Sequence, residues 1–517
     1  MNHQPNFLHE LIIDSFAGGG GASTGIELAL GRIVDIAINH DINAVKMHEA
    51  NHPFTKHYCE NIFEVDPLEA TQGRQVGLLW ASPDCTHFSR AKGGKPVKKE
   101  IRGLAWVVTK WAGAVRPRVI ILENVPEFRT WGPIDEHGKI VVERKGETFN
   151  RFVHSLERLG YAVEWRVLDA SDYGAGTSRK RLYLVARCDG QPIVFPPPTH
   201  GEGKGLLPKK VAADYIDFSV QGKSIFNRKK PLADNTLRRI AMGTDKFTIK
   251  SKKPFIIQSK FGNPPQDIDK PLSVITGVND HTPLIAPHIQ KYFGGEHQAG
   301  SAADAPLGTV TSIDHNALCC ANLIQYHSET NGENARAYGV DEPIKTIDTN
   351  PRYALSTAHL VQYYSTGTAL DIQKPMPTCT TKDRMAVVKT YLVKYTPGAN
   401  LHNWSQIRKL LNKYAGYNIA DDEILILEID GVQYFIADIT LRMLMPHELY
   451  GCQSFPADYI IDRTSDGKKM PIHEQVKKVG NSVCPVMAKA LAAANCADMV
   501  STRRDLRTME EFYREVG

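Results

Sequence analysis

The sequence predicts an α/β fold for its first 198 residues and a β-rich, repeat-containing fold for the middle of the chain. Short apolar runs alternate with helical patterns up to Pro196–Pro198, as in a parallel sheet with crossover helices. Beyond these prolines, Thr and β-branched residues alternate with apolar ones, which is typical of strands. A helical pattern then returns. We therefore expect three segments: 1–198, 199–437 and 438–517.

Apolar runs and helical spacing define the elements of the first and last segments. Buried strands are expected at Leu11–Ser15, Ile33–Ile38, Val76–Ala81, Val119–Leu122 and Leu182–Ala186. Helices are expected between them at Thr24–Leu30, Ala44–Glu49, Ile101–Val115 and Phe149–Leu159. In the last segment we expect helices at Pro446–Leu449 and Cys484–Ala494.

Four units in the middle segment share one internal order, with a period of about 34 residues. Each has an apolar residue before Gln, then a Pro-apolar pair, then Thr alternating with apolar residues. The apolar-Gln pairs are Ile257-Gln258, Ile289-Gln290, Ile324-Gln325 and Val361-Gln362. We expect stacked β elements, and chance similarity among loop-rich β segments is the alternative.

A small α/β insert follows, with a helix at Ser405–Tyr414 and a hairpin at Ile424–Ile436 that turns at Asp430-Gly431.

Composition excludes several classes of protein. The longest apolar runs are far shorter than the roughly 18 residues that span a bilayer, and Met1–Glu10 lacks the pattern of a secretory signal. The nine cysteines show no zinc-knuckle spacing and the chain needs no disulfides, so we expect a reduced cytosol and no metal. The net charge of +5 is compatible with nucleic acid but is weak support for it.

A glycine-rich turn, Asp14–Gly21, follows the first expected strand. Glycines let the backbone approach a ligand, and the next helix offers unpaired N–H groups at its start. No Gly-Lys-Ser/Thr ending is present, which disfavours an ATPase loop. The position after a first parallel strand favours a nucleoside cofactor, although a plain turn is the alternative.

Pro83-Asp84-Cys85 follows the strand at Val76–Ala81. A cysteine in such a loop becomes a nucleophile when nearby cations favour its thiolate, although inert cysteines are more common. The basic run Arg90, Lys92, Lys95, Lys98, Lys99 and Arg102 comes next, opposed only by Glu100. This run suits a lid over a polyanion, and a solvated loop is the alternative.

Two further motifs adjoin strands. Glu123-Asn124-Val125 follows Val119–Leu122, so desolvation can raise the pKa of Glu123 until it acts as an acid. Arg179 and Arg181 alternate before the strand at Leu182–Ala186 and point to one face, whereas Lys180 points away. A solvent-facing Glu and an exposed basic edge are the alternatives.

In this order the motifs resemble the DNA (cytosine-5) methyltransferase family. The resemblance covers residues 11–198 and 439–491. Asp14–Gly21 is similar to the family's cofactor loop, Pro83–Cys85 to its nucleophile loop and Glu123–Val125 to its acidic motif. Arg179 and Arg181 are similar to its paired arginines. Arg442–Phe455 is similar to the helix that supports the recognition domain, and Gly480–Val483 to the late motif that completes the cofactor pocket. The fold it implies is a Rossmann-like S-adenosylmethionine-dependent methyltransferase sheet with a β-rich, repeat-containing target-recognition domain.

The resemblance implies roles for particular residues. Cys85 attacks carbon 6 of a flipped-out cytosine, Glu123 assists at nitrogen 3, and Arg179 and Arg181 hold the base. S-adenosylmethionine contacts are expected from Phe16, Ala17, Gly18, Gly20, Asn39, His40, Asn61, Ile62, Ser82, Asn481 and Ser482. Phosphate contacts are expected from Ser89, Arg90, Lys92, Lys95, Lys98 and Lys99. Gln258, Gln290, Gln325 and Gln362 are among the polar residues of the repeats that would read base edges.

Several residues depart from the family pattern. Asp84 stands where proline is usual before the cysteine, Thr86 replaces the common Gln, and Thr177 replaces a Gln before the arginines. Asn39 and Asn61 stand where acids are expected to bind the ribose and the adenine amino group, which predicts weaker cofactor binding.

The resemblance implies a sequence-specific enzyme of DNA methylation, of the restriction-modification type, that acts on double-stranded DNA. We expect a DNA-associated monomer in the cytoplasm of a bacterial or phage-infected cell, without membrane contact, and a cognate restriction endonuclease is a candidate partner. The alternatives are an RNA cytosine-5 methyltransferase, a non-catalytic DNA-binding regulator, and transfer of a modified methyl group. An amino-group methyltransferase is disfavoured because no Asn/Asp-Pro-Pro-aromatic motif replaces the cysteine loop.

Overall fold

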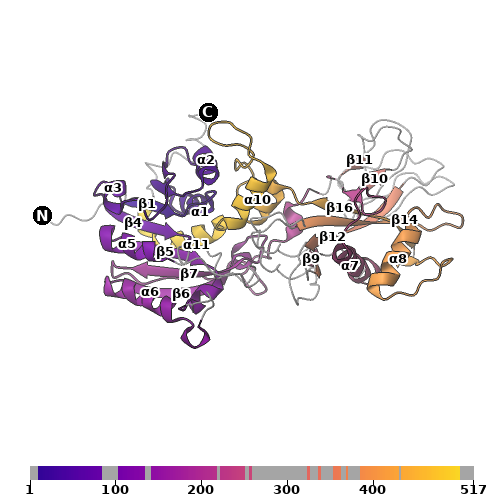
Figure 1. Ribbon diagram of the computed structural model, residues 1–517, viewed down its shortest axis with the longest axis horizontal. Coiled ribbons are helices and arrows are strands. Elements are labelled where there is room, and N and C mark those ends of the chain that lie inside the picture. The colour runs from indigo at the N-terminus through magenta and orange to yellow at the C-terminus, as the bar shows by residue number, and fades with distance from the viewer. Residues whose placement is uncertain are drawn as a thin grey trace. The chain divides into compact units, whose positions relative to one another are not determined.

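The computed structural model describes residues 10–83, 103–133, 141–217, 220, 222–250, 385–429 and 432–500, together with the backbone of short strands between 256 and 370. The chain divides into two compact units, which are described separately (Figure 1). Unit 1 comprises Met1–Lys209, Val274–Thr276 and Gln453–Gly517, and unit 2 comprises Lys210–Ser273 and Gly277–Cys452. No helix in the described ranges is long and apolar enough to cross a membrane.

Unit 1 contains a seven-stranded sheet with the strand order β3-β2-β1-β4-β5-β7-β6. The strands are β1 (Leu11–Ser15), β2 (Ile36–Ile38), β3 (Lys56–Tyr58), β4 (Val76–Ala81), β5 (Val119–Asn124), β6 (Ala162–Asp169) and β7 (Lys180–Arg187). The expected α/β sheet is confirmed, but it is not wholly parallel, because β7 runs antiparallel to both β5 and β6. The link between β6 and β7 is too short for a crossover helix, so the two strands pair as a hairpin.

Helices cover both faces of this sheet. They are α1 (Gly21–Leu30), α2 (Ile42–Asn51), α3 (Pro67–Thr71), α5 (Trp106–Val115), α6 (Glu147–Arg158), α10 (Ile472–Asn481) and α11 (Pro485–Asn495). One core cluster joins the sheet to α5 and α6, and the other joins it to α1 and α11. The helix expected from Ile101 begins only at Trp106 within the described residues. The C-terminal α11 therefore completes the core of the N-terminal sheet.

The contact between α1 and α11 depends on a glycine. A Cβ at Gly25 would collide with the carbonyl oxygen of Pro485 and would stand 2.6 Å from the Ala488 Cβ and 2.8 Å from the Lys489 nitrogen. Backbone atoms cannot move aside as a flexible side chain can. The close approach of the two helices is therefore possible only with glycine at this position.

We expect Gly25→Ala to lower the free energy of unfolding by about 1–3 kcal/mol, because overpacking must separate α1 from α11. The matched control is Gly113→Ala in α5, where the nearest atom to an added Cβ is 3.9 Å away. This second change should stabilise the protein by roughly 0.5–1 kcal/mol through helix propensity. Denaturant unfolding of both variants measures the difference, and equal effects would contradict the packing argument.

Unit 2 is built on an antiparallel sheet, to which nine of the described strands belong. They are β8 (Lys223–Ser224), β9 (Ile256–Gln258), β10 (Leu323–Gln325), β11 (Arg336–Tyr338), β12 (Tyr353–Gln362), β13 (Thr368–Leu370), β14 (Met385–Lys394), β15 (Leu427–Ile429) and β16 (Val432–Met443). The helices are α7 (Asp234–Gly243), α8 (Trp404–Ala415) and α9 (Pro446–Cys452). The expected insert is present as α8 and the β15–β16 hairpin, whose turn residues Asp430 and Gly431 lie outside the described residues.

Both segment boundaries differ from the expected positions. Residues 199–209 remain in unit 1, where Lys209 Nζ pairs with Asp172 at 2.6 Å. At the other end β16 continues past residue 437, since Leu441 still pairs with Val388 of β14. The chain therefore returns to unit 1 at Gln453 rather than at residue 438.

Three of the four repeated apolar-Gln pairs end a strand. Ile257-Gln258 ends β9, Ile324-Gln325 ends β10 and Val361-Gln362 ends β12. The fourth pair, Ile289-Gln290, and the Pro-apolar and Thr features of every unit lie outside the described residues. The repeat therefore stays a prediction.

Candidate active site

The glycine-rich turn between β1 and α1 has a backbone that favours glycine. Gly18 and Gly20 have φ values of 56° and 91°, and Phe16 also has a positive φ of 64°. A Cβ at Gly20 would collide with the hydroxyl of Tyr459, whereas one at Gly18 would find its nearest atom 3.8 Å away, the Phe16 carbonyl oxygen. The turn is thus closed at Gly20 and open at Gly18, where a ligand can approach the backbone.

The parallel register brings other expected cofactor residues to this turn. Ala17 N–H donates to the Ile38 carbonyl at 3.1 Å, and Ser82 N–H donates to the Ser15 carbonyl at 3.2 Å. Asn39 and Ser82, which follow β2 and β4, therefore flank the turn on the adjacent strands. His40 comes next and is exposed.

The remaining expected cofactor residues, all in unit 1, follow β3 or lie in the C-terminal segment. Ile62 is buried and Asn61 is exposed, and the Asn61 side chain accepts the N–H of Phe63 at 3.2 Å. Ser482 is buried and packs against the first residue of α1, because a Cβ at Gly21 would collide with the Ser482 hydroxyl oxygen. Asn481, the last residue of α10, is exposed.

Asp41, which lies shortly after β2, already has hydrogen-bond and ion-pair partners within the protein. The Asn39 side chain accepts the N–H of Asp41 at 2.8 Å, and the Asp41 carboxylate caps α2. Its Oδ2 also receives the ammonium groups of Lys477 and Lys478 at 3.1 and 2.5 Å. Partial burial opposes ionisation, but the two lysines outweigh it and lower the pKa of Asp41. Asp41 therefore connects α2 to α10, and the Asn39 side chain shapes the turn between β2 and α2.

Asp14 is a buried carboxylate that we did not expect as a site residue. It lies in β1, and Ser23 Oγ donates to its Oδ2 at 2.8 Å, while no described residue hydrogen-bonds its Oδ1. Burial raises the pKa of Asp14 to about 7. Because buried polar atoms normally have partners, the free Oδ1 beside an open glycine turn fits a polar group of a nucleoside cofactor.

This raised pKa predicts a pH-dependent stability. Unfolded Asp14 ionises near 3.8 and folded Asp14 near 7, so the folded state loses stability as the pH rises between these values. Asp14→Asn removes that loss, amounting to a few kcal/mol at most. The free energy of unfolding of the variant minus that of the wild type should be more positive at pH 8 than at pH 4, as measured by denaturant unfolding. An unchanged difference between the two pH values would contradict the raised pKa.

Glu123 and the two arginines lie on neighbouring strands at the same end of the sheet. Glu123 is the second-last residue of β5 and is 7% exposed, and Arg181 Nε lies 3.0 Å from its Oε1. Arg179 and Arg181 are buried and Lys180 is exposed, which confirms the expected alternation. Arg179 Nη1 donates to the Gly480 carbonyl at 3.2 Å, so this arginine also holds the late motif.

Three buried polar atoms in this cluster have no hydrogen-bond partner among the described residues: Glu123 Oε1, Thr177 Oγ1 and Arg179 Nε. The ion pair between Arg181 and Glu123 does not have the direction of a hydrogen bond. Leaving such a group unpaired costs about 1–3 kcal/mol. A bound polar ring such as a nucleobase would supply the missing partners.

The beginning of the cysteine loop is fixed to the same cluster. Asn124 Nδ2 donates to the Pro83 carbonyl at 3.2 Å, and Pro83 is two residues before Cys85. Cys85 lies outside the described residues, as do the expected DNA contacts Ser89, Arg90, Lys92, Lys95, Lys98 and Lys99.

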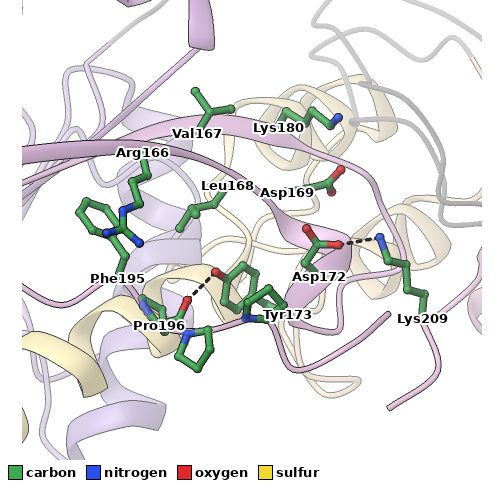
Figure 2. Close-up of a pocket in the computed structure, with 12 residues that line it drawn as sticks. Arg166, Val167, Leu168, Asp169, Asp172, Tyr173, Lys180, Phe195, Pro196 and Lys209 are labelled. Carbon is green, nitrogen blue, oxygen red and sulfur yellow. Dashed lines mark hydrogen bonds and ion pairs between the residues drawn. The ribbon is translucent and has the colours of Figure 1, made fainter. Parts of the chain in front are cut away.

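A surface pocket of about 590 Å³ in unit 1 is lined by none of the expected site residues, although Lys180, between the two arginines, lines it. Figure 2 shows that β6 and the proline-rich segment line it, with Arg166 beside Phe195. Asp172 and Lys209 form an ion pair at its edge, and the Tyr173 hydroxyl donates to the Pro196 carbonyl at 2.8 Å. The polar groups of this pocket named above already pair with one another, so we do not include the pocket in the candidate site.

Part of the chain is similar to known DNA methylases. A family model described as C-5 cytosine-specific DNA methylase matches residues 11–246. The Type II methylase M.HgiDII of Herpetosiphon aurantiacus is 32% identical over 240 residues, which are 44% of this chain and 62% of that protein. The Type II methyltransferase M.AquIA of Picosynechococcus is 27% identical over 227 residues, 40% of this chain and 88% of that protein.

The matches are partial. For the Type II methyltransferase M1.HphI of Haemophilus parahaemolyticus, identity is 26% over 39% of this chain and 54% of that protein, so the chain spans little more than half of some relatives it matches. A solved structure of the S. pombe Dnmt2 methyltransferase aligns over 95% of this chain and 99% of its own, with 13% identity and a TM-score of 0.45. Residues 11–246 are therefore similar to the C-5 cytosine-specific DNA methylase family.

Proposed function

We propose that this protein transfers a methyl group from S-adenosylmethionine to carbon 5 of cytosine in duplex DNA. The hydrogen bond from Asn124 to Pro83 is the observation that carries the proposal, because it ties the chain before Cys85 to the residue after Glu123. Two residues of extended chain span at most about 7 Å. On this proposal, Cys85 and Glu123 would act on the same pyrimidine ring.

Residues of this chain perform the addition and the protonation. The Cys85 thiolate adds to carbon 6 while Glu123 protonates nitrogen 3, which makes carbon 5 nucleophilic. S-adenosylmethionine supplies the electrophilic methyl group. A base then removes the carbon 5 proton, the carbon–sulfur bond breaks and returns the thiolate, and nitrogen 3 gives its proton back to Glu123. Arg181, beside Glu123, would hold the exocyclic oxygen of the base.

The residues that would hold S-adenosylmethionine surround the glycine turn. The open backbone at Gly18, the free Oδ1 of Asp14 and the polar side chains of Asn39 and Ser82 line the sheet edge next to that turn. The target base must leave the duplex to reach the buried Glu123, at a cost of a few kcal/mol. Contacts from the basic segment after Cys85 to the phosphates would offset that cost.

A transfer assay with radiolabelled S-adenosylmethionine tests the proposal on duplex DNA and on tRNA. We expect label in the duplex only, and bisulfite sequencing should place it at cytosines within one recurring motif. Label in tRNA alone would favour an RNA methyltransferase. Duplex binding without label would favour a non-catalytic regulator.

A further inference from the structure

We propose that Tyr459 is a positioning residue for the cofactor, and that its hydroxyl fixes the glycine turn from the C-terminal segment of the chain. This inference rests on the proposed use of S-adenosylmethionine. Tyr459 is 440 residues from the turn in sequence, and it belongs to neither the turn nor the late motif at Gly480–Val483.

Two hydroxyl groups hold consecutive carbonyls of the turn. The Tyr459 hydroxyl donates to the Gly19 carbonyl at 2.6 Å, and Thr24 Oγ1 donates to the Gly20 carbonyl at 2.8 Å. The Gly20 N–H in turn donates to the Ala17 carbonyl at 3.0 Å. The peptide group between Gly19 and Gly20 is thus held at both its oxygen and its nitrogen. Glycine has the largest conformational freedom of any residue, so these bonds select one shape of the turn.

The His52 ring is close to both the Thr24 and the Tyr459 hydroxyl groups. Its Nε2 is 3.3 Å from Thr24 Oγ1 and 3.4 Å from the Tyr459 hydroxyl, and its Nδ1 is 2.9 Å from Glu27 Oε2. Each hydroxyl has one proton and gives it to a glycine carbonyl, so both present oxygen lone pairs to Nε2. The contact of Nδ1 with the buried Glu27 keeps the ring in this position.

Tyr459 is fixed in place before any ligand binds. The neighbouring Ile460 exchanges two hydrogen bonds of 2.8 Å with the side chain of Asn51 in α2. Farther along, Lys46 pairs with Asp466 at 2.6 Å, which attaches the segment to the same helix. The rings of Phe455 and Tyr459 are also in contact, with centroids 4.8 Å apart. Because the segment is already ordered, removing one hydroxyl should loosen the turn and leave the segment attached.

The test compares Tyr459→Phe with Tyr161→Phe in the full-length protein. The Tyr161 hydroxyl donates to the Pro117 carbonyl at 2.7 Å, so both changes remove a hydrogen bond between a tyrosine and a carbonyl from unit 1, buried at Tyr161 and partly buried at Tyr459. Calorimetric titration with S-adenosylhomocysteine should give a Kd about tenfold higher for Tyr459→Phe, the loss of one hydrogen bond. Tyr161→Phe should leave the Kd within about twofold, although both variants lower the unfolding temperature similarly.

Kinetics distinguish positioning from a general loss of structure. For Tyr459→Phe we expect KM for S-adenosylmethionine to rise and kcat at saturating cofactor to stay near the wild-type value. An unchanged Kd in Tyr459→Phe, or an equal increase in Tyr161→Phe, overturns the inference. If the wild type itself fails to bind S-adenosylhomocysteine, the proposed function fails instead, so the two failures are distinguishable.

Discussion

Cys85→Ala should abolish methyl transfer while duplex binding persists. The thiolate forms the bond that activates carbon 5, and removal of a catalytic nucleophile typically costs about four orders of magnitude or more in rate. A cysteine thiol adds little to affinity, because contacts with phosphates supply most of the binding free energy. Single-turnover transfer and a gel-shift titration on one duplex measure the two quantities.

The control for this change is Cys59→Ala, which removes an exposed cysteine of unit 1. It should retain the wild-type rate, because its side chain lies outside the described catalytic cluster. A Cys85→Ala protein with more than a tenth of the wild-type rate would remove Cys85 from the mechanism.

Glu123→Gln should slow methyl transfer by about two to four orders of magnitude, the usual contribution of general acid catalysis. Glutamine has the same shape and can donate a hydrogen bond to nitrogen 3, but it cannot deliver a proton. The change also removes the ion pair between Glu123 and the buried Arg181, which should lower the unfolding temperature. Rates are therefore measured well below that temperature.

Glu157→Gln is the matched control, since it makes the same change on the exposed side of α6 in the same unit. It should leave both the rate and duplex binding unchanged. If Glu123→Gln stays within tenfold of the wild type while its unfolding temperature drops, Glu123 has a structural role only.

Strands buried on both faces were the predictable part of the fold. Leu11–Ser15 and Val76–Ala81 are fully buried in the middle of the sheet, and their bounds agree with the expected runs. β6 was missed because it is an edge strand, most of whose residues are polar or exposed. The antiparallel direction of β7 has no signature in its own residues, because a buried apolar run looks the same in either direction.

The candidate site divides in the same way. Glu123, Arg179 and Arg181 could be identified because each belongs to a short motif beside a strand, and the structure places them together. The contacts of Tyr459 with Gly19 and of Gly480 with Arg179 join residues hundreds of positions apart, so no local pattern reveals them. Asp14 stands within a recognised motif, but its raised pKa follows from burial, which appears only after folding.

Trapping with a duplex that contains 5-fluorocytosine is the most direct test of the covalent mechanism. Fluorine cannot leave carbon 5 as a proton does, so the reaction should stop with the enzyme attached to carbon 6. Mass spectrometry of wild-type protein incubated with this duplex and S-adenosylmethionine should find the methylated adduct on the peptide that contains Cys85. Wild-type protein that methylates ordinary duplex DNA but forms no adduct with the fluorinated one, or forms it on another residue, would contradict this account.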